Sequence, residues 1–335
     1  MSVAVRIAGT AIGFPCEAGE SVLDAAERAG YAIPYSCRKG VCATCEGALL
    51  EGSAEVGREI VAGPREAVLL CRLKPLSDVA IAPKRIERRD PLARKRITAS
   101  VFRLNRPAPD VSIVQLRFPA GIRAKFRAGQ YLRVLIGDGD SRNFSMANPP
   151  NQSDGVELHI RHVPGGRFSE TVLATLVPGD KLDVELPFGE FFLREDDKPI
   201  VLIATGTGFA PIKSIVEDMI KRGIRRPAKL FWGAHRQADF YMRELIAKWS
   251  AQARWLTTTL VLSEAAGGAP GRLVHRAVLD EVGDLSGHQV YACGNPLMIE
   301  AARADFARIG KLPEHEFYAD PFVATGDVAA ERQSA

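Results

Sequence analysis

The sequence predicts a multidomain protein of three successive units: an α+β unit, an antiparallel β-barrel or β-sandwich unit, and an α/β unit with a doubly wound parallel sheet. Three observations support this. Residues 1–82 mix short strand and helix patterns around a cysteine-rich loop, and residues 97–195 hold short strands separated by Gly- and Pro-rich turns. Residues 196–335 alternate apolar strands with helical stretches of about 10–15 residues. A length of 335 residues fits two or three domains.

The first unit begins with strand-like stretches at residues 3–7 and 12–15. A short helix is expected next, with Ser21 as its N-cap and Gly30 after its end. Residues 48–56 and 68–83 predict further strands. A basic segment at residues 83–96, with two prolines and no apolar period, follows, and we interpret it as an interdomain linker.

Charge and composition exclude several classes of protein. The net charge of +4 divides into −2 for residues 1–82, +5 for residues 83–96 and +1 for the remainder. One short basic segment is not a nucleic-acid-binding surface, so we expect no nucleic-acid partner. With 46% hydrophobic residues and no apolar run of the roughly 18–20 residues that a bilayer span needs, we expect a globular protein without a membrane partner. The N-terminus does not have the pattern of a signal peptide, and we expect a cytoplasmic location.

Four cysteines have a spacing that points to metal chemistry. Cys37, Cys42 and Cys45 form the pattern C-x4-C-x2-C, and Cys71 follows 26 residues later. This is the spacing of plant-type ferredoxins, in which four thiolates hold a [2Fe–2S] cluster. Gly40 permits the tight backbone curl that such a loop needs. A zinc site, disulfides and buried structural cysteines are the alternatives; zinc sites usually have a second close pair, which Cys71 lacks, and disulfides are rare in the cytosol.

The middle unit carries a possible phosphate site. Gly165 and Gly166 precede a predicted helix and allow close backbone approach at its start, where N–H groups favour a phosphate. Ser169 adds a hydroxyl, and the guanidinium of Arg142 can pair with a pyrophosphate. Each of these signals also has a purely structural explanation, as a turn, a helix cap or packing on a strand.

The last unit has a glycine turn between a strand and a helix. Gly206, Thr207 and Gly208 follow the apolar strand at residues 198–204, and Pro211 suits the first position of the next helix. A dinucleotide pyrophosphate can bind at such a helix start. Pro211 replaces the third glycine of the usual dinucleotide-binding pattern.

These motifs together resemble the ferredoxin–NADP reductase superfamily. Residues 142–145 (RNFS) and 166–169 (GRFS) match its flavin motifs R-x-Y-S and G-x-x-S, and residues 206–211 match its G-T-G-x-A-P motif. The resemblance implies FAD, bound by Arg142, Asn143, Phe144, Ser145, His159, Arg161, Val163, Gly165, Gly166 and Ser169. Phe144 stands where the family has Tyr, which retains ring stacking and loses the phenol hydrogen bond. The N-terminal unit is similar to plant-type ferredoxins, which implies a β-grasp fold for it.

The resemblance also implies a nicotinamide site. Residues 293–296 (CGNP) match the family motif C-G-x-P, so Cys293 is expected beside the nicotinamide, with Gly294 and Pro296 shaping the pocket. We expect Cys293 and Ser145 to serve catalysis, and Phe322 or Tyr318 to cover the flavin. Asp239 can accept a hydrogen bond from a free ribose 2′-hydroxyl, which favours NADH over NADPH, although His235 and Arg236 are nearby.

The order of the three units resembles the reductase components of bacterial aromatic-ring-hydroxylating dioxygenases and multicomponent monooxygenases, particularly those of terephthalate-type dioxygenases. This implies electron transfer from NADH through FAD to the [2Fe–2S] cluster and on to a terminal oxygenase, by a monomer. Reductases of deoxysugar formation share the layout and are an alternative. A redox sensor needs no nicotinamide site, and an oxygenase needs a substrate site that we do not find in the sequence. We expect Glu20, Asp24 and Glu27 to form an acidic docking face.

Overall fold

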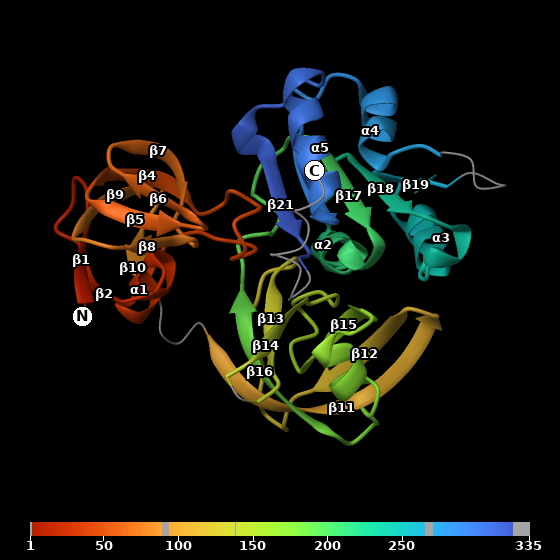
Figure 1. Ribbon diagram of the computed structural model, residues 1–335. Coiled ribbons are helices and arrows are strands. Elements are labelled where there is room, and N and C mark those ends of the chain that lie inside the picture. The colour runs from red at the N-terminus through yellow and green to blue at the C-terminus, as the bar shows by residue number, and fades with distance from the viewer. Residues whose placement is uncertain (1, 89–93, 138, 265–270, 324–335) are drawn as a thin grey trace. The chain divides into compact units, whose positions relative to one another are not determined.

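The computed structural model describes residues 2–88, 94–137, 139–264 and 271–323. It consists of two compact units, residues 1–94 and 95–335, and each has its own sheets (Figure 1). The second unit contains an antiparallel sheet followed by a parallel one. Within the described residues, no helix is both long and apolar enough to cross a membrane.

The first unit is built on a mixed five-stranded sheet, in which β1 and β9 are parallel and the other neighbours are antiparallel. In order across the sheet, its strands are β2 (Gly13–Glu17), β1 (Ser2–Ile7), β9 (Val79–Pro83), β4 (Glu46–Glu51) and β7 (Arg65–Leu69). A smaller sheet contains β6 (Glu59–Ala62), β5 (Ser53–Val56) and β8 (Leu73–Pro75).

The helix in the described part of this unit begins where the sequence predicts. In α1 (Val22–Arg28), the Ser21 side chain accepts a hydrogen bond from the N–H of Asp24, which satisfies one of the donors that a helix start leaves free. Its buried face carries Val22, Leu23, Ala25 and Ala26.

Much of the basic segment at residues 83–96 is strand in the part that the structure describes. Glu87–Arg88 forms β10, which pairs with β3 (Tyr31–Ala32), and Lys95 begins the long strand β11. Residues 89–93 of the expected linker lie outside the described residues. The prolines and charges of this segment therefore did not reveal its strand pairing.

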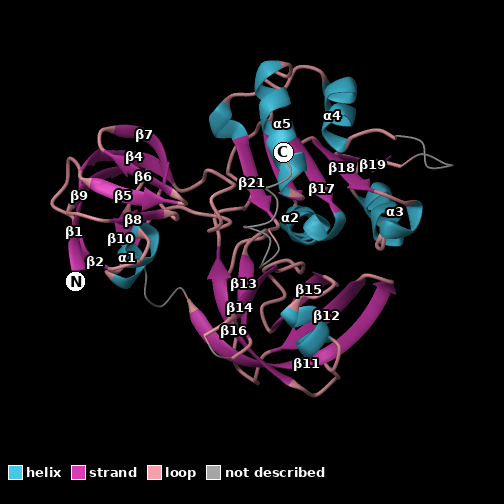
Figure 2. Ribbon diagram, in the orientation of Figure 1, coloured by secondary structure: helices cyan, strands magenta, loops and turns pink. Residues whose placement is uncertain are grey.

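The antiparallel sheet of the second unit has six strands and curls strongly (Figure 2). In order they are β14 (Ser141–Ser145), β13 (Tyr131–Leu135), β16 (Lys181–Phe188), β11 (Lys95–Ala108), β12 (Val111–Arg117) and β15 (Gly155–Arg161). An isolated bridge between Met146 and Leu158 joins the end of β14 to the opposite edge strand, β15. A short π-helix, η1 (Phe168–Leu173), packs Phe168 and Leu173 into the core of this sheet.

The parallel sheet has its first strand at the centre. Its order is β19 (Leu256–Leu262), β18 (Ala228–Ala234), β17 (Ile200–Thr205), β20 (Gln289–Gly294) and β21 (Phe317–Pro321). The helices that cover it are α2 (Phe209–Arg222), α3 (Arg243–Gln252), α4 (Val274–Val282) and α5 (Pro296–Arg308), with the 3₁₀ turns η2 (Gly206–Gly208), η3 (Gln237–Asp239) and η5 (Glu314–Glu316).

Helices lie on both faces of this sheet (Figure 2). Alternate residues of β17 separate two cores: Leu202 packs with residues of α2 and α3, whereas Val201 and Ile203 pack with residues of α4 and α5. The chain runs from β17 outward to β19 and then returns to β20 on the other side. This reversal lies between β17 and β20, and open α/β sheets bind ligands outside the carboxyl ends of strands at such a point.

Candidate functional site

Three of the four predicted cluster cysteines lie in one loop, and the sheet brings the fourth to them. Cys37, Cys42 and Cys45 lie between β3 and β4, and Cys71 follows β7. Because β4 pairs with β7, the N–H of Leu70 donates to the carbonyl of Cys45 at 3.1 Å, which holds Cys71 beside the loop. All six cysteines of the chain are described, and none is in a disulfide.

The four thiols interact in two pairs, and the N–H of Cys37 donates to Sγ of Cys42 at 3.5 Å. Cys37 donates to Cys42, and this bond lowers the pKa of Cys42 to about 5 and raises that of Cys37. Cys71 likewise lowers the pKa of Cys45. Among the described residues, no three His, Cys, Asp or Glu side chains surround one point as the ligands of a single ion do. Two pairs of thiols suit a cluster of two irons, so the residues fit a [2Fe–2S] cluster.

The loop leaves no room for a side chain at its centre. Gly40 has φ +79°, and a Cβ atom there would lie 2.9 Å from Cγ of Arg72. Glycine is therefore required by both backbone conformation and space.

The predicted acidic face around α1 is neutralised by arginines. Arg28 pairs with Glu20 at 2.8 Å, Arg38 of the cysteine loop pairs with Asp24 and Glu27 at 2.6 Å, and Arg94 lies 3.4 Å from Glu27. The charge of this face is thus compensated by Arg28 of the same helix and by Arg38 and Arg94 from other segments, and its role in docking stays a prediction.

Ser145, on β14, has an unsatisfied polar atom. Its hydroxyl is buried and has no hydrogen-bond partner among the described residues. A buried hydroxyl without a partner is costly, so this one fits a polar group of a bound molecule. Asn143 is exposed on the same strand, and the ring of Phe144 packs 4.9 Å from that of Phe168.

Two arginines of this region share one carboxylate. Arg142 donates to Asp140 and to the carbonyl of Ser141, and Arg167 lies 3.2 Å from Asp140. Sequence reasoning singled out Arg142 and missed Asp140, which holds it. The Asp140 carboxylate therefore holds the guanidinium groups of Arg142 and Arg167 near the start of β14.

The predicted phosphate loop uses its N–H groups internally. Val163 donates to the hydroxyl of Ser169 at 3.1 Å, Gly165 donates to Glu170 at 2.5 Å, and Gly166 donates to the carbonyl of Val163 at 2.9 Å. These contacts give the loop a fixed shape.

The ring of His159 is held by protein. It is buried, and its ring nitrogens contact the hydroxyl of Tyr241 at 2.9 Å and Glu157 at 3.1 Å. Both ring nitrogens are therefore engaged, and the expected role of His159 in flavin binding stays a prediction. Arg161, two residues later, reaches the glycine turn of the parallel sheet, because a Cβ atom on Gly206 would lie 3.1 Å from the Arg161 guanidinium.

The glycine turn and the late Cys-Gly motif meet at the reversal point of the sheet. Gly206–Gly208 follows β17, and β20 ends with Cys293 and Gly294. A Cβ atom on Gly208 would lie 2.4 Å from the carbonyl oxygen of Cys293, and one on Gly294 would lie 2.3 Å from Oγ1 of Thr205. The two turns pack backbone to backbone, as a nucleotide-binding crevice requires.

The two prolines of these motifs lie in the first turns of helices. The sequence suggested that Pro211 is the first residue of this helix. The helix α2 begins at Phe209, however, so Pro211 is its third residue. Its missing N–H is still one of the four that a helix start leaves unbonded. Pro296 begins α5, and Asn295 caps that helix by accepting from the N–H of Leu297 at 2.8 Å.

Cys293 is buried, and its thiol donates to the carbonyl of Asp320 at 3.1 Å. Burial raises the pKa of Cys293 well above its usual range, so the thiol is neutral. Phe322 lies beside it, because its N–H donates to the carbonyl of Gly294 at 2.8 Å.

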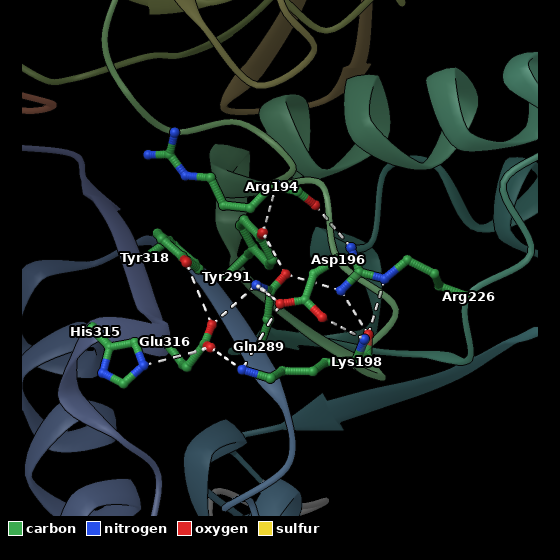
Figure 3. A network of polar contacts seen from close by, with 9 residues as sticks. All are labelled: Arg194, Asp196, Lys198, Arg226, Gln289, Tyr291, His315, Glu316 and Tyr318. Carbon is green, nitrogen blue, oxygen red and sulfur yellow. Dashed lines mark hydrogen bonds and ion pairs between the residues drawn. The ribbon is translucent and has the colours of Figure 1, made fainter.

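Tyr318 lies near the opposite end of β21. Figure 3 shows its hydroxyl pointing at Glu316, 3.4 Å away, in a polar network with Gln289 and Arg226. Tyr318 thus precedes the carboxyl end of its strand, and this placement favours Phe322 over Tyr318 as the residue expected to cover the flavin.

Asp239 lies in η3, five residues after the end of β18. One carboxylate oxygen accepts from the N–H of Arg236 at 2.8 Å, which fixes the side chain at this position. The neighbouring His235 and Arg236 are exposed.

Sequence reasoning missed Lys213, a buried lysine in α2. One signal was available: Lys213 is four residues after Phe209 and three before Val216, so it lies on the apolar face of the helix. A charged residue on such a face needs a partner.

Three family models match successive parts of the chain. They describe a 2Fe-2S iron-sulfur cluster binding domain over residues 5–76, an oxidoreductase FAD-binding domain over residues 100–193 and an oxidoreductase NAD-binding domain over residues 202–304.

Similar proteins match over nearly the whole length. Reductase component 2 of terephthalate 1,2-dioxygenase from Comamonas sp is 45% identical, over 97% of this chain and 98% of that protein. The CDP-6-deoxy-L-threo-D-glycero-4-hexulose-3-dehydrase reductase of Yersinia pseudotuberculosis is 34% identical, over 96% and 99%. The solved structure of a cytochrome P450 reductase from Amycolatopsis superposes with a TM-score of 0.77 and 28% identity, covering 96% of this chain and 100% of that one.

Proposed function

The chain belongs to the family of oxidoreductases that join a 2Fe-2S domain, an FAD-binding domain and an NAD-binding domain, and from this premise we propose its reaction and its partner. It oxidises NADH and passes the electrons through FAD and its own [2Fe–2S] cluster to the terminal oxygenase of an aromatic-ring-hydroxylating dioxygenase, of the terephthalate type. The observation that carries the proposal is the 45% identity across all three domains to a terephthalate dioxygenase reductase.

In the ferredoxin domain, Cys37, Cys42, Cys45 and Cys71 would together hold the [2Fe–2S] cluster. The sheet pairing that brings Cys71 beside the loop of the other three supports this assignment. Gly40 keeps the centre of the loop free of side chains, so that backbone N–H groups approach the sulfides. We assign this domain a β-grasp fold.

In the flavin domain, which we propose is a closed β-barrel, Arg142 holds the pyrophosphate of FAD and Phe144 stacks on its ring system. The orphaned hydroxyl of Ser145 bonds to a polar edge of that ring. Asn143, Val163, Gly165, Gly166 and Ser169 complete the proposed site, the last four as members of a loop whose shape is fixed by its internal hydrogen bonds. FAD, when bound, would accept two electrons from NADH and release them one at a time to the cluster, which is why it stands between the two.

In the nicotinamide domain, Gly206, Thr207 and Gly208 bind the pyrophosphate of NADH at the start of α2, in the first turn of which Pro211 lies. Arg161 adds a positive charge from the flavin domain, because its guanidinium lies against Gly206. Cys293, Gly294 and Pro296 line the nicotinamide pocket, and Phe322 covers the flavin. The neutral thiol of Cys293 contributes shape without charge. Asp239 accepts from the ribose 2′-hydroxyl and repels the 2′-phosphate of NADPH.

The proposal keeps the domain boundaries of the sequence analysis: 1–82 for the ferredoxin domain, 83–96 for the linker, 97–195 for FAD and 196–335 for NADH. It also includes a monomeric state, a cytoplasmic location and no membrane or nucleic-acid partner. Six reduced cysteines suit a compartment that keeps thiols reduced.

Anaerobic mixing with NADH tests the reductase activity. We expect bleaching of the flavin absorbance and then a rhombic electron paramagnetic resonance signal from the reduced cluster. Failure of both NADH and NADPH to reduce the loaded protein contradicts the proposal and favours a sensor. Cys42→Ser should abolish the resonance signal and leave flavin reduction intact, and an unchanged signal would overturn the ligand assignment.

A second candidate partner is a deoxysugar-forming dehydratase, favoured by the 34% identity to the Yersinia reductase. A multicomponent monooxygenase is the third. Reconstitution with each purified partner separates them: we expect NADH-dependent product only with the aromatic-ring dioxygenase. Product formed only with the dehydratase or the monooxygenase identifies the alternative.

A further inference from the structure

The strand β15 has one apolar and one polar face, and the middle of the polar face is covered. Val156, Leu158 and Ile160 point into the core of the antiparallel sheet. The alternate residues Glu157 and His159, with Arg161 after them, form the other face, because successive strand side chains point to opposite sides. Such a polar face normally meets solvent.

Here each of these three residues contacts the nicotinamide domain, although Arg161 is also exposed and donates to Asp110 at 2.8 Å. Glu157 lies 3.1 Å from Lys213, His159 contacts Tyr241 at 2.9 Å, and the guanidinium of Arg161 lies against Gly206. The side chain of Lys213 is only 8% exposed, so the central ion pair is shielded from water.

The Lys213 ammonium donates two hydrogen bonds in addition to its ion pair with Glu157. Besides Glu157, its Nζ atom lies 2.9 Å from Glu217, one turn later in α2, and 3.2 Å from the carbonyl of Ala147. The hydroxyl of Ser214 donates to the carbonyl of Asn148 at 2.7 Å. The helix is thus tied both to β15 and to the segment that directly follows β14.

The carboxylate of Glu157 is charged and fully bonded. Burial opposes its ionisation, but the hydrogen bond from His159 and the charge of Lys213 lower the pKa of Glu157 below its usual range. Gln115 donates to its second oxygen at 2.9 Å. Burial lowers the pKa of His159, so the ring is neutral and donates to Glu157 from Nε2 while Nδ1 accepts from Tyr241.

This network connects the two cofactor sites by a short path through the chain. Ser145, the flavin candidate, is two residues from Ala147, and Gly208, the end of the nicotinamide turn, is five residues from Lys213. The indole N–H of Trp232 donates to the carbonyl of Gly206 at 3.1 Å, which fixes the turn to its own sheet. A shift of α2 relative to the Ala147–Asn148 segment would therefore change the spacing of the two sites.

We propose that Lys213 is a positioning residue, which holds the nicotinamide-binding turn at the distance from the flavin that electron transfer between the two rings needs. This inference rests on the proposed function. The polar contacts of Lys213 among the described residues include none of the residues that we propose to bind FAD or NADH; Lys213 acts through Glu157, Ala147 and the helix α2. Reacting groups must be held within a few tenths of an ångström, and a 1 Å misplacement can cost about a hundredfold in rate.

The test is Lys213→Met in the FAD- and cluster-loaded protein, followed by rapid mixing with NADH. We expect the limiting rate of flavin reduction to fall at least about tenfold, because the geometry is lost, while the NADH dissociation constant changes less than about twofold, because the pyrophosphate turn is intact. The long-wavelength charge-transfer absorbance of the NADH–flavin complex should weaken in parallel. Lys213→Arg, which keeps the charge and the donors, should recover part of the rate.

Lys221→Met is the matched control, because Lys221 is exposed on the last turn of the same helix. It should leave rate and affinity unchanged. An unchanged limiting rate in Lys213→Met, or a fall that Lys221→Met shares, overturns the proposal. If Lys213→Met does not fold, Ser214→Ala is the second variant, because it removes only the hydrogen bond to the carbonyl of Asn148. It should slow flavin reduction about threefold, and no slowing overturns the proposal.

A second readout does not depend on turnover. In the FAD-free protein, hydrogen–deuterium exchange of residues 144–148 should be about tenfold faster in Lys213→Met than in the wild type, and unchanged exchange contradicts the tie. If NADH does not reduce the wild-type flavin, the proposed function fails, while the exchange experiment still decides whether Lys213 fixes this segment.

Discussion

Gly208 lies against the backbone of Cys293, so that a Cβ atom on Gly208 would come within 2.4 Å of the Cys293 carbonyl oxygen and 2.6 Å of its carbonyl carbon. Neither neighbour is the flexible end of a side chain. The two turns at the reversal point of the sheet therefore keep their spacing only while residue 208 is glycine.

Gly208→Ala should weaken NADH binding at least about tenfold, or about 1.4 kcal/mol, because the added methyl group displaces one turn from the other. Flavin and cluster absorbance should remain. Titration of the oxidised protein with NAD⁺ or a non-reducing analogue measures the change. Gly287→Ala is the control, because a Cβ atom there meets nothing within 4 Å. Equal affinity of Gly208→Ala and wild type would show that the nucleotide binds elsewhere.

Ser145→Ala should preserve or raise the stability of the flavin-free protein and lower its affinity for FAD. The buried hydroxyl of Ser145 has no partner among the described residues, so its removal should leave the flavin-free protein as stable or more stable. FAD affinity should fall about fivefold, or about 1 kcal/mol. Ser112→Ala is the control: the Ser112 hydroxyl is 2.8 Å from Nε2 of His162, so this variant should lose stability and keep FAD affinity. Calorimetry with and without FAD measures both, and unchanged FAD affinity in Ser145→Ala removes that residue from the site.

Glu27→Gln should destabilise the ferredoxin domain. Burial alone would raise the pKa of Glu27, but the charges of Arg38 and Arg94 outweigh it and lower the pKa to about 2. A carboxyl whose pKa is lowered on folding stabilises the fold above its unfolded pKa near 4.5, and that stabilisation is lost as the pH falls through about 2. The shift corresponds to at most about 3 kcal/mol.

We therefore expect the midpoint temperature for loss of the cluster absorbance to fall by at least about 5 °C in Glu27→Gln. The difference should be constant between about pH 6 and pH 9, because Glu27 stays ionised throughout. Glu59→Gln should change little, since its pair with Arg65 is exposed. A difference that grows or vanishes within this pH range would contradict the assigned pKa.

Asp239→Asn should shift the preference from NADH toward NADPH. The amide oxygen can still accept from the N–H of Arg236, so the local turn is retained, while the charge that repels a 2′-phosphate is lost. We expect the ratio of kcat/KM for NADH to that for NADPH to fall about tenfold. Asp280→Asn, on the surface of α4, should leave the ratio unchanged. An unaltered ratio in Asp239→Asn would remove Asp239 from the ribose site.

Local features were predictable from the sequence. The spacing of Cys37, Cys42 and Cys45, the cap at Ser21 and the turn at Gly206–Gly208 depend on residues a few positions apart, so sequence neighbours are also neighbours in space. The alternation of three domain patterns along the chain likewise follows from the period of apolar residues.

Contacts between distant segments were not predictable. Arg38 and Arg94 neutralise an acidic face that looks uncompensated along the chain, and Asp140 gathers Arg142 and Arg167. Strand β15 gives the clearest contrast. Its alternation of apolar and polar residues determined that it is a strand and which face enters the core. Only the tertiary structure decided that Glu157, on the polar face, meets α2 rather than water, because its ion pair with Lys213 joins residues 56 positions apart in the sequence.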